Sequence, residues 1–410
     1  MRWMAPAPGW ALAGEVPIAA VNAALKLSIE RVMCYLFCLC STPGRRYLIA
    51  SLICLEVLLV KVLYGLFSQC GTLRYRNPLM TSQRPILALS TGDPGGIGPE
   101  ICLKAALDKD VQRLCRPVLV GDPIAVEAHI KGGGLPGTVD PVNSLTDVDG
   151  ATNHLPLIAR DQFSEAPFQM GAITAQNGIA SVDSSVTAIQ MALEGNVAAV
   201  VAAPNTKSSI NRAGIEYDGH LSLVARETGM SQDDIFMMLS FGRVNLAHCT
   251  LHSSVRRSLE LITRKRVVSV IKAVHETLIA TGIPAPRIIV SGVNPHASEG
   301  GLFGEEEAEI IAPAIEDARV EGIQLEGPVP ADLMLHREDA DAFIVMLHDQ
   351  GHIPAKVMAR HGAAGVIIGS PIRFASVGHG SALDIAGQGI ANPDAMIEAI
   401  RWFFGDTQLP

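Results

Sequence analysis

The stretch PILALSTGDPGGIGPEICLKAAL, Pro85 to Leu107, decides how most of this chain is interpreted. A short apolar run is followed by a loop rich in glycine and proline and then by a segment with helical character. Short apolar runs of this kind suit strands that are buried on both faces of a sheet. The stretch therefore predicts a strand, a tight turn and a helix, in that order.

The same arrangement recurs three times further along the chain, in VAAVVAAP (Val197–Pro204), RIIVSGVNPH (Arg287–His296) and AFIVMLHDQG (Ala342–Gly351). Alternating buried strands and helices predict an α/β protein with a mostly parallel sheet and flanking helices. Such sheets bind ligands at the carboxyl ends of their strands. The polar residues after these runs are therefore the first candidates for a site.

The first 79 residues differ from the rest of the chain. They hold eight Lys/Arg against three acids, a net charge of +5. Because the whole chain has a net charge of −9, the residues from 80 onward carry −14. Tyr47–Phe67 is strongly apolar, but Glu56 and Lys61 interrupt it, whereas a membrane span needs about 20 apolar residues with few charges. We consider a misplaced start with Met80 as the true first residue, a membrane anchor and a targeting segment.

Composition limits the classes of function. With 48% hydrophobic and 18% charged residues the chain is globular, and its net charge of −9 argues against sequence-independent binding of nucleic acid. Beyond residue 79 only Cys102, Cys115 and Cys249 occur. Three scattered cysteines do not form a disulfide framework, so we expect a cytoplasmic protein.

Three histidines follow apolar runs: His252, His296 and His348. Three neutral imidazoles suit a borderline divalent ion such as Zn²⁺ and leave positions open for substrate oxygens. Each histidine alone is more often a surface or core residue, and their separation in sequence forbids a local-motif argument. The trio is a candidate metal site.

Two glycine-rich stretches are candidate ligand loops. TGDPGGIGPE (Thr91–Glu100) precedes a helix N-terminus, where backbone N–H groups attract anions, although it is not the usual dinucleotide fingerprint. SVGHGSALDIAGQGIANP (Ser376–Pro393) would let a flat cofactor lie against the backbone. The alternative for the second stretch is a plain turn before a helix.

Five motifs carry a family resemblance: GDPGGIGPE, NPHASEGGLFGEEE, GPVPAD, LHDQGHIPAK and VGHGSALDIAGQG. In this order the chain, from about Pro85 to Phe404, resembles the 4-hydroxythreonine-4-phosphate dehydrogenase family of vitamin B6 biosynthesis. The resemblance implies the two-domain isocitrate/isopropylmalate dehydrogenase-like fold. It predicts a cofactor-side domain from about 80–205 and 325–410, and a dimerisation and metal-side domain from 206–324, with 1–79 outside the match.

The resemblance also implies roles for individual residues. The metal ligands of the family fall on His252, His296 and His348, and its substrate-binding residues on His220 and Lys356. Lys207 and Asp332 match positions suited to proton transfer or substrate orientation. The nicotinamide cofactor, NAD or NADP, is expected on the C-terminal loop, which contributes His379, Gly380, Ser381, Asp384 and Asn392. A homodimer with a shared active site, and Zn with Mg, Mn or Co as alternatives, are implied too.

Three departures concern the substrate. Leu221, Gly365 and Phe374 stand where the family has Thr, Asn and Arg, and Arg373 is displaced by one position. Because the missing groups are those that hold a phosphate, the chain is expected to favour another substrate. TLHSSVRRSLE (Thr250–Glu260) resembles the branch of this family that acts on the dihydrodiol dicarboxylate of terephthalate breakdown.

We therefore predict a metal- and NAD(P)-dependent dehydrogenase that oxidises a small hydroxy acid or dihydrodiol carboxylate, with decarboxylation. The alternative is 4-hydroxythreonine-4-phosphate dehydrogenase itself. A rival from another class is a membrane-tethered binding protein with an inactive dehydrogenase fold, against which the complete histidine trio argues.

The first prediction concerns residues 1–79. A chain that starts at Met80 is expected to express in soluble form and to retain activity. Residues 1–79 lie outside the family resemblance, and their net charge is positive whereas that of the remaining residues is negative. Soluble yield and NAD⁺-dependent absorbance change, compared with the full chain, check this. An insoluble or inactive short chain beside an active long one would instead support the membrane interpretation.

Overall fold

The computed structural model describes residues 84–142, 145, 153–359 and 362–405. They fall within the unit Arg76–Pro410. The apolar segment Tyr47–Phe67 lies outside the described residues, so its three interpretations stay open. In the part of the chain that is described, no helix is long and apolar enough to cross a membrane.

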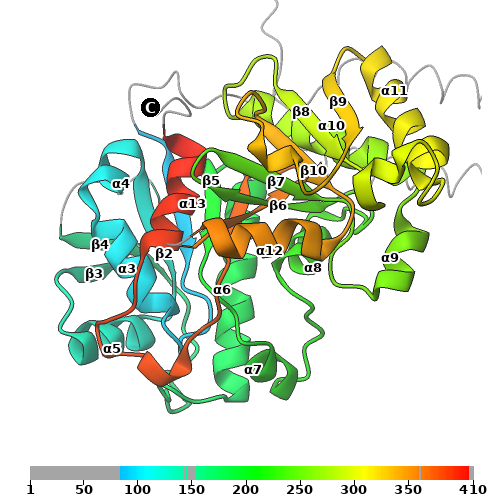
Figure 1. The fold of residues 1–410 in the computed structure, drawn as a ribbon. Helices are drawn as coiled ribbons and strands as arrows, with labels where there is room; N and C mark the ends of the chain where they lie inside the picture. The colour runs from blue at the N-terminus through cyan, green and yellow to red at the C-terminus, as the bar shows by residue number, and fades with distance from the viewer. Residues whose placement is uncertain (1–83, 143–144, 146–152, 360–361, 406–410) are drawn as a thin grey trace, which may run out of the picture. The chain divides into compact units, whose positions relative to one another are not determined.

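The described strands form one twelve-stranded sheet in the order β3-β4-β2-β1-β5-β12-β11-β6-β7-β10-β8-β9 (Figure 1). Their bounds are β1 Ile86–Ser90, β2 Arg116–Gly121, β3 Thr138–Pro141, β4 His154–Ala159, β5 Ala199–Ala202, β6 Phe236–Phe241, β7 Val244–His248, β8 Arg287–Ser291, β9 Gln324–Val329, β10 Ala342–Val345, β11 Ala364–Ile368 and β12 Phe374–Val377. The predicted α/β fold with a mostly parallel sheet is confirmed.

Two parallel blocks make up most of the sheet. From β3 to β12 every pairing is parallel, and so is every pairing from β7 to β9. Between the blocks, β11 pairs antiparallel with β12 and β6, and β6 pairs antiparallel with β7. Three antiparallel steps reverse the strand direction between the blocks. The two-domain boundaries that we expect from the resemblance remain a prediction.

Helices cover both faces of the sheet (Figure 1). They are α3 Gly98–Leu107, α4 Lys109–Leu114, α5 Pro123–Gly133, α6 Ala175–Leu193, α7 Lys207–Arg212, α8 His220–Thr228, α9 Val255–Leu261, α10 Arg264–Ala280, α11 Ala312–Val320, α12 His348–Met358 and α13 Asp394–Phe404. In β1, Leu87 and Leu89 pack in the core layer that contains α3, α10 and α13 residues, and Ala88 packs in the layer that contains α6 and α8 residues. Because each strand is buried on both faces, its sequence is continuously apolar rather than alternating.

The loop after β1 does not offer its backbone to a ligand. The Asp93 carboxyl group accepts hydrogen bonds from Gly95 N at 2.8 Å and from Ser209 Oγ at 3.0 Å, so the chain supplies its own acceptor at this turn. A Cβ on Gly96 would lie 2.4 Å from the Ser381 carbonyl oxygen. The glycines therefore allow this loop to pack against the C-terminal loop, and the predicted anion site at Thr91–Glu100 is wrong.

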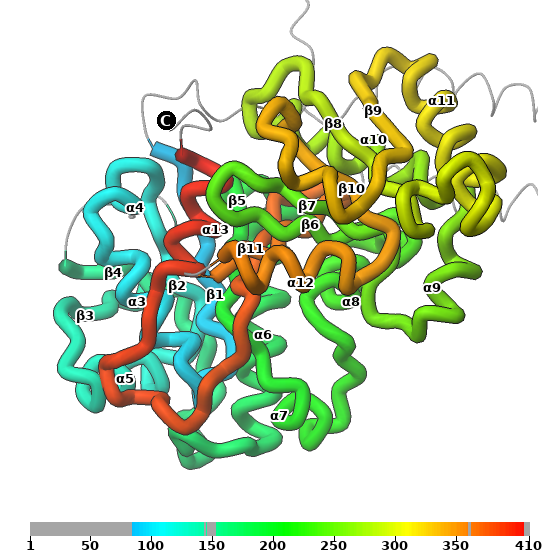
Figure 2. Tube along the Cα trace, viewed as in Figure 1, coloured from blue at the N-terminus to red at the C-terminus, as the bar shows by residue number. Residues whose placement is uncertain are grey.

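A buried ion pair fastens the C-terminal glycine-rich loop to α3. Glu100, which is fully buried, accepts hydrogen bonds from Gly389 N at 3.2 Å and Ala391 N at 2.7 Å. Lys104 Nζ lies 2.8 Å from Glu100 Oε1 and donates to the Gly389 and Ala391 carbonyls at 2.9 and 2.6 Å. Figure 2 shows this C-terminal segment beside α3. The predicted cofactor loop is thus anchored to α3.

The second prediction tests this anchor. Glu100→Ala is expected to lower the free energy of unfolding by about 3 kcal/mol, because it leaves a lysine and two backbone N–H groups without their partner. Urea unfolding measures the change. As the control, Glu127→Ala removes the exposed partner of Lys131 and should change stability by less than about 1 kcal/mol. Equal effects of the two substitutions would contradict a special role for Glu100.

Candidate active site

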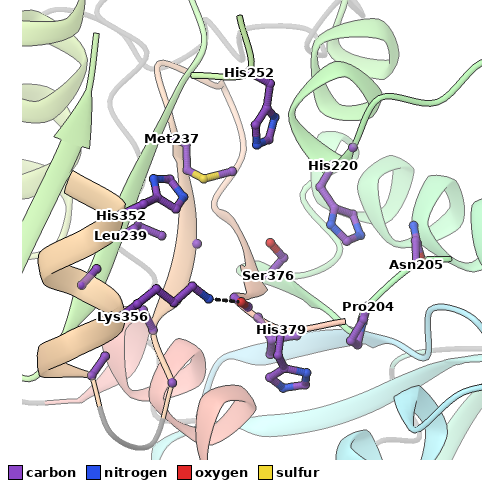
Figure 3. A pocket seen from close by; sticks show the side chains of 18 of the residues that line it. Pro204, Asn205, His220, Met237, Leu239, His252, His352, Lys356, Ser376 and His379 are labelled. Carbon is purple, nitrogen blue, oxygen red and sulfur yellow. Dashed lines mark hydrogen bonds between the residues drawn. The ribbon is translucent and has the colours of Figure 1, made fainter. Parts of the chain in front are cut away.

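A cavity of about 430 Å³ lies where the two parallel blocks meet. Its walls come from the loops after β5, β7 and β12, from β6 and β11, and from α12. Figure 3 shows His252, His220, His352 and Lys356 around this cavity. Five residues predicted from the sequence line it: Lys207, His220, His252, Lys356 and His379.

His220 is the first residue of α8 and is partly buried, with its Nε2 atom shielded from solvent. Burial lowers the pKa of its imidazole to about 4. Its ring lies edge-on to Tyr217, with centroids 6.1 Å apart, and 5.6 Å from the ring of Phe374. Nε2 of His220 has no hydrogen-bond partner in the described structure. A buried polar atom usually has a partner, so this nitrogen is available to a ligand.

Two lysines supply the positive charge of the cavity. Lys356, on α12, extends across it and donates from Nζ to the Gly378 carbonyl at 2.8 Å (Figure 3). Lys207, at the start of α7, lies close enough to His252 to help lower the pKa of that imidazole. Asp218 also lines the cavity. An anionic substrate group is therefore favoured near the lysines.

The three predicted metal ligands follow three adjacent parallel strands. β10 lies between β7 and β8 in the sheet. His348 follows β10, His252 follows β7 and His296 follows β8. The His252 and His348 rings lie 5.7 Å apart. Burial first, then His348 and Lys207, lowers the pKa of His252. His296 is exposed, and no group of three or more His, Cys, Asp or Glu in the described residues is placed to hold a metal ion.

Carboxylates fix the orientation of two of these imidazoles. His348 Nδ1 donates to Asp349 Oδ1 at 2.8 Å, and His296 Nδ1 donates to Glu299 Oε2 at 3.0 Å. This leaves Nε2 of each ring as the nitrogen for a ligand, the arrangement usual for histidines that bind metal. The donor set therefore fits a divalent ion, although one chain brings together only two of the three rings.

The loop that carries His296 has an unusual backbone. His296, Ala297, Ser298 and Glu299 have φ values of 54°, 50°, 67° and 48°, in the left-handed region that non-glycine residues rarely adopt. Glu307 braces the loop by accepting hydrogen bonds from Val293 N and Asn294 N, both at 2.7 Å. Such backbone strain costs about 1–2 kcal/mol per residue and is concentrated at functional sites.

The remaining predicted residues are placed as follows. Asp332 is exposed, follows the edge strand β9 and does not line the cavity. Ser381 is buried, accepts from Thr206 Oγ1 at 2.8 Å and donates to the Pro204 carbonyl at 3.4 Å.

Asn392 Oδ1 accepts from Asp394 N at 2.9 Å at the start of α13. Gly380 and Asp384 lie on the same loop as His379, which lines the cavity.

Of the three positions that depart from the family, two lie away from the cavity. Phe374 is fully buried and Leu221 is partly buried in the same core layer, and neither lines the cavity. Gly365 does line it. Arg373 donates to the Ala280 carbonyl at the end of α10, on the other face of the sheet from Phe374. The apolar wall is instead formed by Met237, Leu239 and Ala355.

Sequence reasoning missed two histidines, His248 and His352. His248 Nε2 lies 3.1 Å from His352 Nδ1, and the His352 ring stacks on His348 with centroids 3.8 Å apart and an interplanar angle of 8°. Burial lowers the pKa of His248 to about 3 and that of His352 to about 4. The signal was present: His352 follows His348 by four residues, the spacing that places two side chains on one face of a helix.

A mostly parallel sheet covered on both faces, with a polar cavity at strand ends, is typical of α/β enzymes that bind small molecules. The chain belongs to the family described as pyridoxal phosphate biosynthetic protein PdxA, whose model matches residues 113–403. Its relatives are dehydrogenases that act on CH–OH groups, and this chain is an oxidoreductase of that type.

Three comparisons stand out. The chain is 40% identical over 322 residues to the 1,2-dihydroxy-3,5-cyclohexadiene-1,4-dicarboxylate dehydrogenase of a Comamonas species, covering 78% of this chain and 98% of the relative. The crystal structure of 4-hydroxythreonine-4-phosphate dehydrogenase from Klebsiella pneumoniae matches with a TM-score of 0.73 and 32% identity, over 80% of this chain and all of that one. A terephthalate 1,2-cis-dihydrodiol dehydrogenase structure from Burkholderia xenovorans matches at 0.61 and 34%, over 79% and 98%.

The third prediction follows from the buried His220. In the unfolded chain this imidazole takes up a proton near its ordinary pKa of about 6.5, whereas in the folded chain it does so only near pH 4. The unfolded state therefore binds more protons between these values, and stability falls as the pH falls through this window. Between pH 7 and 5 His220 alone should account for a loss of about 2 kcal/mol.

Urea unfolding of the native chain and His220→Gln at both pH values measures this contribution. The difference between the two pH dependences isolates His220, because the other histidines are common to both proteins. Parallel pH dependences would show that His220 is not buried in its neutral form.

Proposed function

We propose that this chain oxidises a cyclic dihydrodiol or small hydroxy acid that carries carboxylates, with NAD or NADP as acceptor, a bound divalent metal and loss of CO₂. The observation that carries the proposal is the composition of the cavity. Neutral His220, two lysines and the apolar side chains of Met237 and Leu239 line one space. A carbocycle with ionised carboxylates needs this combination.

Each lining residue has a separate proposed role in binding or proton transfer. Lys356 exchanges its 2.8 Å bond to the Gly378 carbonyl for a substrate carboxylate, because a charge-assisted hydrogen bond is about twice as strong as a neutral one. Nε2 of His220 bonds a substrate oxygen, and Met237, Leu239 and Ala355 cover the ring. Lys207, near His252, would in its neutral form take the proton of the reacting hydroxyl, directly or through water, and would carry the positive charge afterwards.

The predicted metal would be held by His252, His348 and His296. When bound, the metal would supply polarisation of the substrate oxygens, and the nicotinamide would supply the acceptor for the hydride. The observation that supports this ligand set is the pair of carboxylate-fixed imidazoles, His348 with Asp349 and His296 with Glu299. The cofactor is proposed to lie along Gly378–Asn392, the loop that the Glu100–Lys104 pair anchors.

A homodimer with a shared active site is part of the proposal. His296 and Asp332 follow β8 and β9, at the edge of the sheet, and do not line the cavity of their own chain. Large apolar side chains are exposed near them in sequence: Leu302 at 72%, Phe303 at 47% and Leu333 at 56%. A second copy that covers these side chains would bring His296 to the cavity of its partner.

A second candidate is the oxidation of 4-hydroxythreonine 4-phosphate, because the same two lysines suit a phosphate. The solved structure with a TM-score of 0.73 has that activity in its name. Against it, the cavity offers Gly365 where the family has Asn, and Arg373 is engaged by the Ala280 carbonyl. Among the lining residues, the side chains that would then bring positive charge to a phosphate dianion are Lys207 and Lys356.

The fourth prediction separates the two candidates by steady-state kinetics. The kcat/KM for the dihydrodiol dicarboxylate should exceed that for 4-hydroxythreonine 4-phosphate by at least about tenfold, since one missing charge-assisted contact costs roughly 1.5–3 kcal/mol. Release of CO₂ together with NADH or NADPH would identify the decarboxylating reaction. A larger kcat/KM for the phosphate substrate would replace this proposal with the second candidate.

A further inference from the structure

His248 and His352 form a built pair behind the cavity. His248 is the last residue of β7 and is 1% exposed. Its Nε2 lies 3.1 Å from Nδ1 of His352, one turn along α12 from His348. The pair therefore links the sheet to the helix that carries both His348 and Lys356.

A glycine makes this approach feasible. A Cβ placed on Gly351 would lie 2.3 Å from His248 Nε2 and 2.9 Å from its Cε1. Those distances are too short for any side chain, so only glycine lets the His248 ring rest against α12. The local sequence HDQGH therefore provides both the space for His248 and the imidazole that it meets.

The other side of the His352 ring faces ligand space. His352 lines the cavity together with Met237, Leu239 and Lys356 (Figure 3). Because its Nδ1 is occupied by His248, Nε2 is the nitrogen left for a ligand. The ring is also stacked on His348 at 3.8 Å, which prevents it from turning.

We propose that His352 is a specificity-determining residue that hydrogen-bonds a hydroxyl group of the bound diol, and that His248 is a positioning residue that holds its ring. This inference rests on the proposed function. A hydroxyl both donates and accepts, so it meets Nε2 of an imidazole in either tautomer. The contact adds recognition of the second hydroxyl of a diol to the recognition of carboxylates by the lysines.

Two isosteric variants separate this role from simple packing. In His352→Asn the amide replaces Nδ1 and keeps the contact with His248, but nothing reaches the cavity. In His352→Gln the longer side chain places its amide where Nε2 lies. The readouts are the Kd for 1,2-dihydroxy-3,5-cyclohexadiene-1,4-dicarboxylate, measured by calorimetry without nicotinamide cofactor, and the metal content of each purified protein.

We expect His352→Asn to raise the Kd about three- to tenfold, the loss of one neutral hydrogen bond, with metal content unchanged. His352→Gln should weaken binding less than His352→Asn, because it keeps a polar group at the cavity although it loses the contact with His248. Equal Kd values for the native protein and both variants would overturn the inference. Equal weakening by both variants, or weakening accompanied by loss of metal, would show that His352 acts through packing on His348 and would also overturn it.

A double-mutant cycle tests the part played by His248. His248→Asn should raise the Kd in the native background and have no further effect in His352→Asn. Gly351→Ala, which forces a Cβ into the His248 ring, should reproduce the effect of His248→Asn. Additive effects would show that His248 does not act through His352. If the native chain binds no diol at all, the proposed function fails and takes this inference with it.

Discussion

The site depends on one topological constraint, the position of β10 between β7 and β8 in a parallel block. Because the carboxyl ends of parallel strands lie together, the loops that bear His252, His348 and His296 must leave the sheet at the same end. The antiparallel strands β6 and β11 then reverse direction toward the other block, whose loops supply Lys207 and His379. The cavity is a consequence of that reversal. The buried pair of Glu100 and Lys104 anchors the C-terminal glycine-rich loop, which also carries His379.

Electrostatics within the cavity favours recognition by shape and hydrogen bonding over recognition by charge alone. Burial keeps His220 and His352 neutral near pH 7, so the positive charge is confined to the lysines among the lining residues. Neutral imidazoles suit hydroxyl groups, and the lysines suit carboxylates. Met237, Leu239 and Ala355 add an apolar wall. These features are the basis on which we propose a carboxylated diol as the substrate.

Much of this could be predicted from the sequence, because buried parallel strands leave continuous apolar runs and ligand-binding residues follow them. His252, Lys207 and Lys356 were found in this way, with the family resemblance, and all line the cavity. Phe374 and Arg373 point to opposite faces, as the alternation of side chains along a strand predicts. The packing role of the glycines in Thr91–Glu100 could not be predicted, because it depends on contacts with segments distant in the sequence. His248 and His352 were missed because their contact joins residues 104 positions apart.

The central claim is that the three histidine loops hold one divalent metal at this cavity, with a second copy of the chain completing the set. Anomalous diffraction at the zinc edge, from crystals of the full chain grown with Zn²⁺, tests it most directly. The account predicts one ion per cavity with imidazole nitrogens of His252, His348 and the partner subunit's His296 at about 2.0–2.1 Å. An ion bound by other residues, or a metal-free cavity in a protein that is fully active, would contradict it.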